Sequence, residues 1–214
     1  ITYVREVAEQ TLQAVNLPGG AYNFGSEADV SMSALAELFM KKTGMKLTIG
    51  YQHRHKPEST YLKSVIDRGD LGDIYYAKAY AIRRRGTPNW GVFLNEYEQG
   101  GGPLIDNGVH LIDLVRYLTG RPRAVSCYAA TYNNIGSRTH VKGIDRYASV
   151  DPSSFNDVED LAVGMVRFEG GMTMSLEFSY SQEIEEGVVG VEIYGSKGGA
   201  IVEPKLRLMT EMND

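Results

Sequence analysis

The sequence predicts an α+β fold in which a large, mainly antiparallel mixed sheet is backed by a few helices. Two observations lead to this prediction. After Pro122 the chain is a series of short apolar segments separated by glycine-containing turns, and several of these segments alternate with the period of two that a sheet with one covered face requires. Before Pro122, apolar residues recur with helical spacing between recognisable helix start and stop signals.

The first 45 residues read as helix, strand and helix. Thr2 can cap a helix that ends before Pro18, and residues 21–25 form a short strand-like segment. Ser31 can cap a second helix that stops at Gly44, a residue suited to a left-handed C-cap.

Residues 46–122 alternate between strands and helices. Residues 46–52 read as a buried strand, and Pro57 can begin a helix that runs toward Gly69. A long strand is expected at 74–85, then a loop rich in Gly, Pro and Asn, then a helix from Leu104 to Leu118. Further strands are predicted at 124–132, 160–168, 171–180, 187–195 and 200–204.

Composition excludes several classes of protein. The 214 residues are 43% hydrophobic and 23% charged, which is ordinary for a globular protein, and the net charge of -5 argues against nucleic-acid binding. Apolar segments fall short of the roughly 20 residues that a membrane helix needs, so a cytoplasmic protein is expected. Cys127 is alone in an apolar stretch, cannot form an internal disulfide, and is expected to pack in the core.

The helix at 104–118 carries an unusual polar stripe. At 100° per residue, Asp106, His110 and Asp113 fall on one side, while Leu111 and Val115 lie on the opposite, apolar side. Burying ionisable groups is costly unless they are paired or open into a wet cleft. His110 could exchange a proton with a substrate hydroxyl while a carboxylate one turn away orients it; a structural His–Asp pair explains the same pattern equally well.

Other motifs are less specific. The GGGP segment before this helix resembles a phosphate-binding loop only loosely, because the GxGxxG and GxxxxGK[ST] spacings are absent. Trp90, in a long loop that follows three arginines, suits the face of a sugar, although an aromatic loop anchor is as reasonable. His53, His55 and His140 lack the spacing of metal ligands, so no metal site is predicted.

The segment GGGPLIDNGVHLIDLVRYLTG resembles the signature helix of the Gfo/Idh/MocA oxidoreductases. GYQHRHKPE, RRRGTPNWG, VEDLAVGMVRFEGG and EIYGSKGGA resemble further family segments in the same order, so the resemblance covers residues 46–212. It implies that Asp106 and His110 are catalytic, that Arg54, Trp90, Asn107 and Asp113 line the substrate cleft, and that Gln52 lies near an NAD or NADP cofactor. Hydride would then pass between nicotinamide and a sugar or polyol carbon.

The family's dinucleotide-binding loop and its Glu-Lys-Pro lysine are not found in the sequence, and Lys56 lies at the wrong place to replace that lysine. Residues 1–45 instead resemble the C-terminal region of extended short-chain reductases such as dTDP-4-dehydrorhamnose reductase. We therefore expect an incomplete α/β segment at 1–45, no complete Rossmann domain, and a substrate and oligomerisation domain at 46–214 that is truncated at its C-terminus.

Two functions follow from this reading. The first is the substrate-binding and catalytic part of an NAD(P)-dependent sugar or polyol dehydrogenase, inactive as an isolated chain because hydride transfer requires a held cofactor. The alternative is a non-enzymatic sugar-binding or oligomerisation module. A homo-oligomer formed through the sheet is expected in either case, with neither nucleic acid nor membrane as a partner.

Overall fold

The computed structural model describes residues 32–46, 51–88, 91–135, 156–203 and 205–211. The chain divides between residues 50 and 51 into two units. In the first unit, the described part is helix α2 (Met32–Thr43), which confirms the second predicted helix. Lys41 and Lys42 lie in its last turn, where positive charge is favourable, and Gly44 follows with a φ of 66°. The predicted helix after Thr2, the strand at 21–25 and the Ser31 cap lie outside the described residues.

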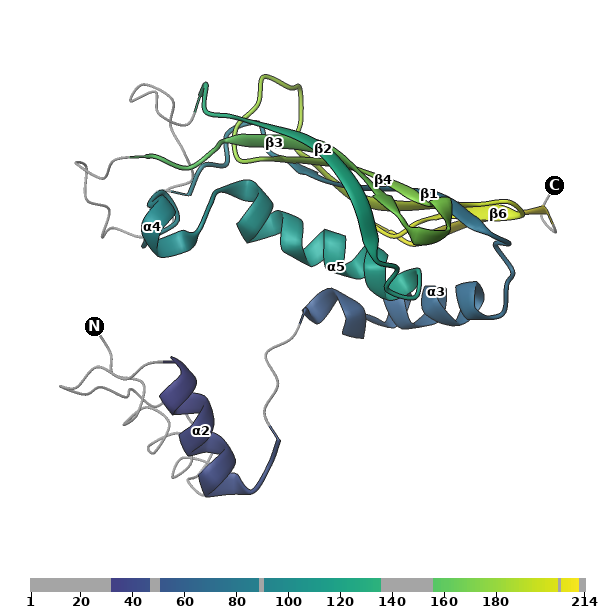
Figure 1. Cartoon of the computed structure of the whole chain (residues 1–214), viewed down its shortest axis with the longest axis horizontal. Helices are drawn as coiled ribbons and strands as arrows, with labels where there is room; N and C mark the ends of the chain where they lie inside the picture. The colour runs from purple at the N-terminus through teal and green to yellow at the C-terminus, as the bar shows by residue number, and fades with distance from the viewer. Residues whose placement is uncertain (1–31, 47–50, 89–90, 136–155, 204, 212–214) are drawn as a thin grey trace. The chain divides into compact units, whose positions relative to one another are not determined.

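The second unit is a sheet with helices on one face, as the sequence predicted (Figure 1). Its helices are α3 (Pro57–Asp67), α4 (Glu96–Gln99) and α5 (Val109–Leu118). Shorter helical turns occupy Gln52–His55 (3-10), Leu104–Gly108 (π) and Glu169–Gly171 (3-10). The strands are β1 (Ile74–Ile82), β2 (Ala124–Tyr132), β3 (Leu161–Phe168), β4 (Thr173–Ser179), β5 (Val188–Gly195), β6 (Gly198–Ile201) and β7 (Arg207–Thr210).

The strands form a seven-stranded sheet in the order β2-β3-β4-β1-β5-β6-β7. Only β1 and β4 pair in parallel among these strands, and the other neighbours are antiparallel. In β1 the small residues Ala77, Ala79 and Ala81 alternate with Tyr76, Lys78 and Tyr80. The alanines lie on the face that the helices cover, and their size lets α5 approach the centre of the sheet.

The core lies between this alanine face and helices α3 and α5. Both helices contribute fully or nearly fully buried apolar residues, and they meet apolar side chains from β4 and β5: Leu62, Val65, Leu111, Leu114, Val115, Leu118, Met174, Phe178, Val191 and Ile193. The predicted apolar side of the 104–118 helix is therefore confirmed. Among the described residues, no helix is long and apolar enough to cross a membrane.

Three local predictions were wrong. Tyr51 and Gln52 are exposed and lead into a 3-10 turn instead of continuing a buried strand. Cys127 is exposed, because β2 is an edge strand whose residues are largely open to solvent. The helix expected from Leu104 begins with a π-helical turn and becomes α-helical only at Val109.

Candidate functional site

The turn that carries Asp106 packs closely against the sheet. The N–H of Val109 donates to the carbonyl of Leu104, five residues earlier, which defines the π-helical turn. Gly108 in this turn lies against Phe178 of β4, and a Cβ at position 108 would stand 2.9 Å from the Phe178 ring. A glycine is required here because the backbone itself contacts the core side chain.

Glu159 holds the start of this helix. Its carboxylate accepts hydrogen bonds from the N–H of Gly102 at 2.7 Å and from the N–H of Leu104 at 3.3 Å. A Cβ on Gly102 would lie 2.1 Å from the Glu159 carbonyl oxygen, so only glycine fits. The GGGP segment thus does bind an anion at a helix N-terminus, but the anion is a carboxylate of the same chain.

Asp106 belongs to a chain of polar contacts at the end of β1. Asn107 donates from Nδ2 to Asp106 Oδ2 at 2.6 Å, and Arg83 donates from Nη2 to Asn107 Oδ1 at 2.9 Å. Arg83 also lies over the ring of Tyr180, with its Cζ 5.9 Å from the ring centroid. Burial raises the pKa of the Tyr180 phenol, and the nearby Asp106 carboxylate adds to the effect.

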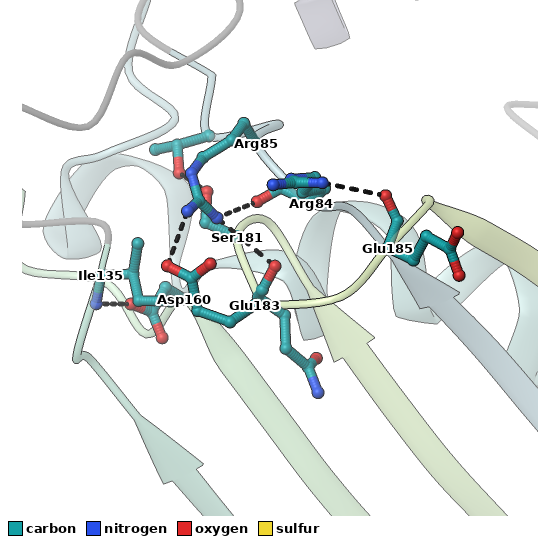
Figure 2. A network of polar contacts seen from close by, with 9 residues as sticks. Arg84, Arg85, Ile135, Asp160, Ser181, Glu183 and Glu185 are labelled. Atoms are coloured by element: carbon teal, nitrogen blue, oxygen red, sulfur yellow. Dashed lines mark hydrogen bonds and ion pairs between the residues drawn. The ribbon is translucent and has the colours of Figure 1, made fainter.

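Two adjacent loops fix Arg83 in this place. Arg84 donates to the carbonyl of Glu185 at 3.2 Å, and Arg85 pairs with the carboxylate of Glu183 at 2.6 Å. Figure 2 draws both contacts. The hydroxyls of Thr87 and Ser181 form a buried hydrogen bond of 2.7 Å between the same two segments. The segment after β1 is therefore tied to the segment after β4.

His110 lies beside the 3-10 turn that precedes α3. Its ring is edge-on to Tyr51, with centroids 5.8 Å apart, and 5.9 Å from the ring of His53. The Nδ1 atom of His110 is buried and makes no hydrogen bond with any described residue. His110 is therefore surrounded by aromatic and imidazole rings, and its Nδ1 lacks the carboxylate partner that a self-contained His–Asp pair would supply.

The carboxylate of Glu203 lies next to His53. The Nδ1 atom of His53 is 3.6 Å from Glu203 Oε1, and the same oxygen pairs with Lys56. Burial lowers the pKa of His53, and the positive charge of Lys56 lowers it further, while Glu203 acts in the opposite direction. A surface pocket of about 460 Å³ begins here and is lined by Lys56, Glu58, Val202, Glu203, Lys205 and Leu206.

Asp113 has a partner of its own. Arg54 donates from Nε to Asp113 Oδ2 at 2.6 Å and from Nη2 to the other carboxylate oxygen, so the pair is bidentate. The guanidinium also lies over the rings of Tyr51 and Tyr117. Two side chains predicted to line the substrate cleft therefore bind each other.

The predicted site residues are thus distributed among three groups of contacts. Asp106 and Asn107 lie at the sheet side, His110 faces the 3-10 turn, and Asp113 binds Arg54. Gln52 is exposed at the start of that turn. The predicted role of Trp90 falls outside the described residues.

The similarity of this domain to known proteins is extensive. Residues 60–201 match the family described as GFO/IDH/MocA C-terminal domain. The chain belongs to the GFO/IDH/MocA family. The resemblance to this family is therefore confirmed, with a match over residues 60–201, and the curated members of the family include sugar and polyol dehydrogenases.

Among GFO/IDH/MocA relatives, a D-glucoside 3-dehydrogenase of Escherichia coli (strain K12) is 36% identical over 165 residues, which cover 77% of this chain and 46% of that protein. A scyllo-inositol 2-dehydrogenase (NAD(+)) of Bacillus subtilis (strain 168) is 28% identical over 158 residues, covering 72% and 40%. The chain thus spans about half the length of these curated relatives or less.

Solved GFO/IDH/MocA-like structures share the fold. Levoglucosan dehydrogenase in complex with NADH and L-sorbose superposes with a TM-score of 0.63 at 19% identity, covering 84% of this chain and 48% of that chain. An oxidoreductase domain protein from Kribbella flavida gives 0.62 at 21% identity, covering 85% and 50%. The comparisons do not support the resemblance of residues 1–45 to short-chain reductases, and the family match begins at residue 60.

Sequence reasoning missed several residues of this site. Arg83 was noted as part of a basic run and Tyr180 as the end of a strand, while Glu159 and Glu203 received no role. A signal existed for Glu159, since a Gly-rich helix start without a phosphate-binding spacing still needs an acceptor for its free N–H groups. For the other three residues, only the packing of distant segments reveals the contact.

Proposed function

We propose that residues 46–214 form the substrate-binding and catalytic domain of an NAD(P)-dependent oxidoreductase that acts on a hydroxyl of a sugar or polyol. The observation that carries the proposal is His110, whose buried Nδ1 is not paired with any described residue, one helical turn beyond the anchored carboxylate of Asp106. In an oxidoreductase family, a buried imidazole whose Nδ1 is not paired is suited to proton transfer.

The residues present fit one end of the cofactor only. Nicotinamide, when bound, supplies the hydride acceptor, and the exposed amide of Gln52 offers both a donor and an acceptor to its carboxamide. The chain has no Gly-rich dinucleotide loop to hold the phosphates. We therefore propose that the nucleotide is held by a separate domain and that the isolated chain does not turn over substrate.

The chain's own residues divide the remaining chemistry. His110 takes the proton of the substrate hydroxyl as the C–H bond of the same carbon gives up its hydride, so that a carbonyl is formed. Asp106, fixed by Asn107, presents its second oxygen to the substrate or to the imidazole. Arg54, Trp90 and Asp113 remain proposed substrate-side residues, with Arg54 and Asp113 acting as a bonded pair.

A fusion enzyme tests this proposal. The chain is joined to the nucleotide-binding half of the E. coli D-glucoside 3-dehydrogenase, and NADH or NADPH formation is followed with a panel of sugars and polyols. We expect His110→Ala and Asp106→Asn each to lower kcat by about 10²- to 10⁴-fold with the fold retained. His55→Ala removes an exposed imidazole from the neighbouring turn and serves as the matched control.

Equal turnover by the fusion and its His110→Ala variant would remove His110 from the mechanism. Saturable sugar binding without turnover by a correctly folded fusion would favour the alternative of a non-enzymatic module. For the unfused chain, NADH that raises the melting temperature would contradict the proposed dependence on a second domain.

We also propose that the uncovered face of the sheet joins two copies of the chain. No helix described within the second unit covers this face, on which Tyr128 of β2 stands opposite Met165 of β3 and is 83% exposed. Its centre holds a half-buried cluster in which Lys78 and Tyr80 both bind Glu192. Burial alone would raise the pKa of Glu192, but its hydrogen bonds lower it.

Sedimentation velocity tests the sheet interface. Tyr128→Glu and Met165→Glu should each convert a dimer or larger oligomer to monomer, because each replaces an exposed apolar side chain of this face with a charge that would be buried unpaired in the interface. Tyr97→Glu, at a 92% exposed position of α4, is the control that should leave the oligomer intact. A wild-type chain that is monomeric at high concentration would exclude this interface.

A further inference from the structure

Tyr180 is a buried polar residue to which the proposed mechanism gives no role. Its side chain is fully buried just after β4, and its backbone is held on both sides: its N–H donates to the Asp160 carbonyl at 2.9 Å, and its carbonyl accepts from the N–H of Gly86 at 2.7 Å. The phenol oxygen makes no hydrogen bond with any residue that the structure describes. An unsatisfied hydroxyl in a well-packed core is costly, so its retention requires an explanation.

The surroundings of the phenol lead to Asp106. Arg83 covers the ring of Tyr180 and donates to Asn107, and Asn107 donates in turn to Asp106 Oδ2. Burial raises the pKa of the Tyr180 phenol, and the negative charge of the Asp106 carboxylate raises it further. The side chain of Asn107 is one established donor to Asp106.

We propose that Tyr180 is a positioning residue for Asp106, with its phenol O–H serving as the second donor to that carboxylate. Since the phenol is completely buried, it cannot contact a substrate directly and can act only through the groups packed against it. A carboxylate has about four lone-pair directions, so Asn107 and Tyr180 together would leave about two of them available to substrate or to His110. Hydrogen bonds of this kind are commonly long without substrate and tighten in the reactive complex.

Arg83 contacts both proposed donors to Asp106, the amide of Asn107 and the phenol ring of Tyr180, and so fixes their positions. Its guanidinium binds the amide oxygen of Asn107, which leaves the Asn107 N–H₂ directed to Asp106, and it lies over the Tyr180 ring. Its other terminal nitrogen donates to the Gly86 carbonyl at 3.1 Å, and Gly86 donates to the Tyr180 carbonyl. A single cation therefore connects the two donors of the carboxylate.

The catalytic meaning of this arrangement rests on the proposed function of Asp106, but the contact itself can be tested without turnover. The full 214-residue chain is labelled with [¹³Cζ]tyrosine and with ¹⁵N, and the Tyr180 signals are assigned by their loss in Tyr180→Phe. We expect a slowly exchanging hydroxyl proton on Tyr180 whose resonance moves upfield in Asp106→Asn. Asp113→Asn, which removes a carboxylate that binds Arg54 instead, should leave the resonance in place.

Two further readouts separate positioning from packing. In Tyr180→Phe the side-chain amide resonance of Asn107 should shift, because Asp106 has lost its second donor. The folded-to-unfolded ratio of Tyr180→Phe should fall roughly ten-fold or more, as expected for losing a hydrogen bond to a charged group. An unchanged ratio together with an unmoved Asn107 amide would overturn the proposal, as would a Tyr180 hydroxyl signal that ignores Asp106→Asn.

Failure here and failure of the proposed function are distinguishable. If the Tyr180 and Asn107 signals respond as expected while the fusion enzyme is inactive with every sugar and polyol, the positioning contact stands and the dehydrogenase function falls. If the fusion enzyme is active and depends on Asp106 but the Tyr180 signals do not respond, Asp106 is held by Asn107 alone.

Discussion

The ion pair between Arg54 and Asp113 should make a measurable contribution to stability, because it is bidentate and half-buried. The side chains are 28% and 13% exposed, and the pair joins the 3-10 turn at 52–55 to helix α5. Exposed pairs contribute roughly 0.2–1 kcal/mol, and hydrogen bonds to charged groups about 1.5–3 kcal/mol. For this intermediate burial we expect a coupling free energy of about 1–2 kcal/mol.

A double-mutant cycle with Arg54→Met and Asp113→Ala measures this coupling by urea denaturation. Methionine preserves much of the aliphatic stem of Arg54 but removes the guanidinium, which lies over the rings of Tyr51 and Tyr117. Each single variant should also lower Tm, by about 2–4 °C per kcal/mol for a chain of this size. Leaving Asp113 without its partner should cost the most, since its carboxylate is the less exposed group.

The pair of Arg68 and Asp70 is the matched control. It has a comparable separation of 2.7 Å, but its side chains are 55% and 43% exposed. Its coupling should fall below about 0.5 kcal/mol and largely vanish in high salt, whereas that of Arg54 and Asp113 should persist. Equal couplings in the two cycles would refute the reasoning that burial and bidentate geometry make the first pair different.

Three other changes have defined expected outcomes. Gly102→Ala should destabilise the chain by about 3 kcal/mol or more in urea, because the added Cβ meets the Glu159 backbone at 2.1 Å; a loss below about 1 kcal/mol would show that the segment can shift. Leu114→Ala, at a fully buried position, should cost about 2–5 kcal/mol through the cavity it leaves, and Leu114→Met much less. His53→Gln should weaken the loss of stability at acid pH. Burial, aided by the charge of Lys56, lowers the pKa of His53 in the folded chain, so the unfolded chain protonates this residue first as the pH falls. The free energy of unfolding of the wild type should therefore fall as the pH drops below about 6.5. Parallel pH profiles of Tm for wild type and His53→Gln would contradict that assignment.

The parts of the fold that follow from periodicity were predictable from the sequence. The buried side of α5 was read correctly from Leu111, Val115 and Leu118, and β1 to β5 were placed within a few residues of their observed bounds. These elements bury one regular face, so a period of 3.6 or 2 reports their environment directly. The short elements α4 and β7 carry too few residues to establish a period and were not predicted.

The candidate site was predictable only in part, because it depends on one irregular turn and on contacts between distant segments. The helical wheel assumed 100° per residue from Leu104 onward, but the π-helical turn changes that angle before Val109. A stripe of Asp106, His110 and Asp113 was therefore expected where the structure gives each residue different neighbours. The bidentate pair of Arg54 and Asp113 joins residues 59 positions apart, which no local pattern can indicate.

The irregular turn gives the two proposed catalytic residues independent supports. Asp106 is held by Asn107 and, through Asn107, by Arg83 after β1, whereas His110 rests against the rings of Tyr51 and His53. A continuous α-helix would place both side chains on one stripe facing one environment. Because the turn separates those environments, the carboxylate can be anchored by fixed donors while the imidazole Nδ1 stays unpaired among the described residues. An acid–base residue must change its protonation state during the reaction, so it benefits from this freedom, whereas a carboxylate that orients it benefits from being fixed.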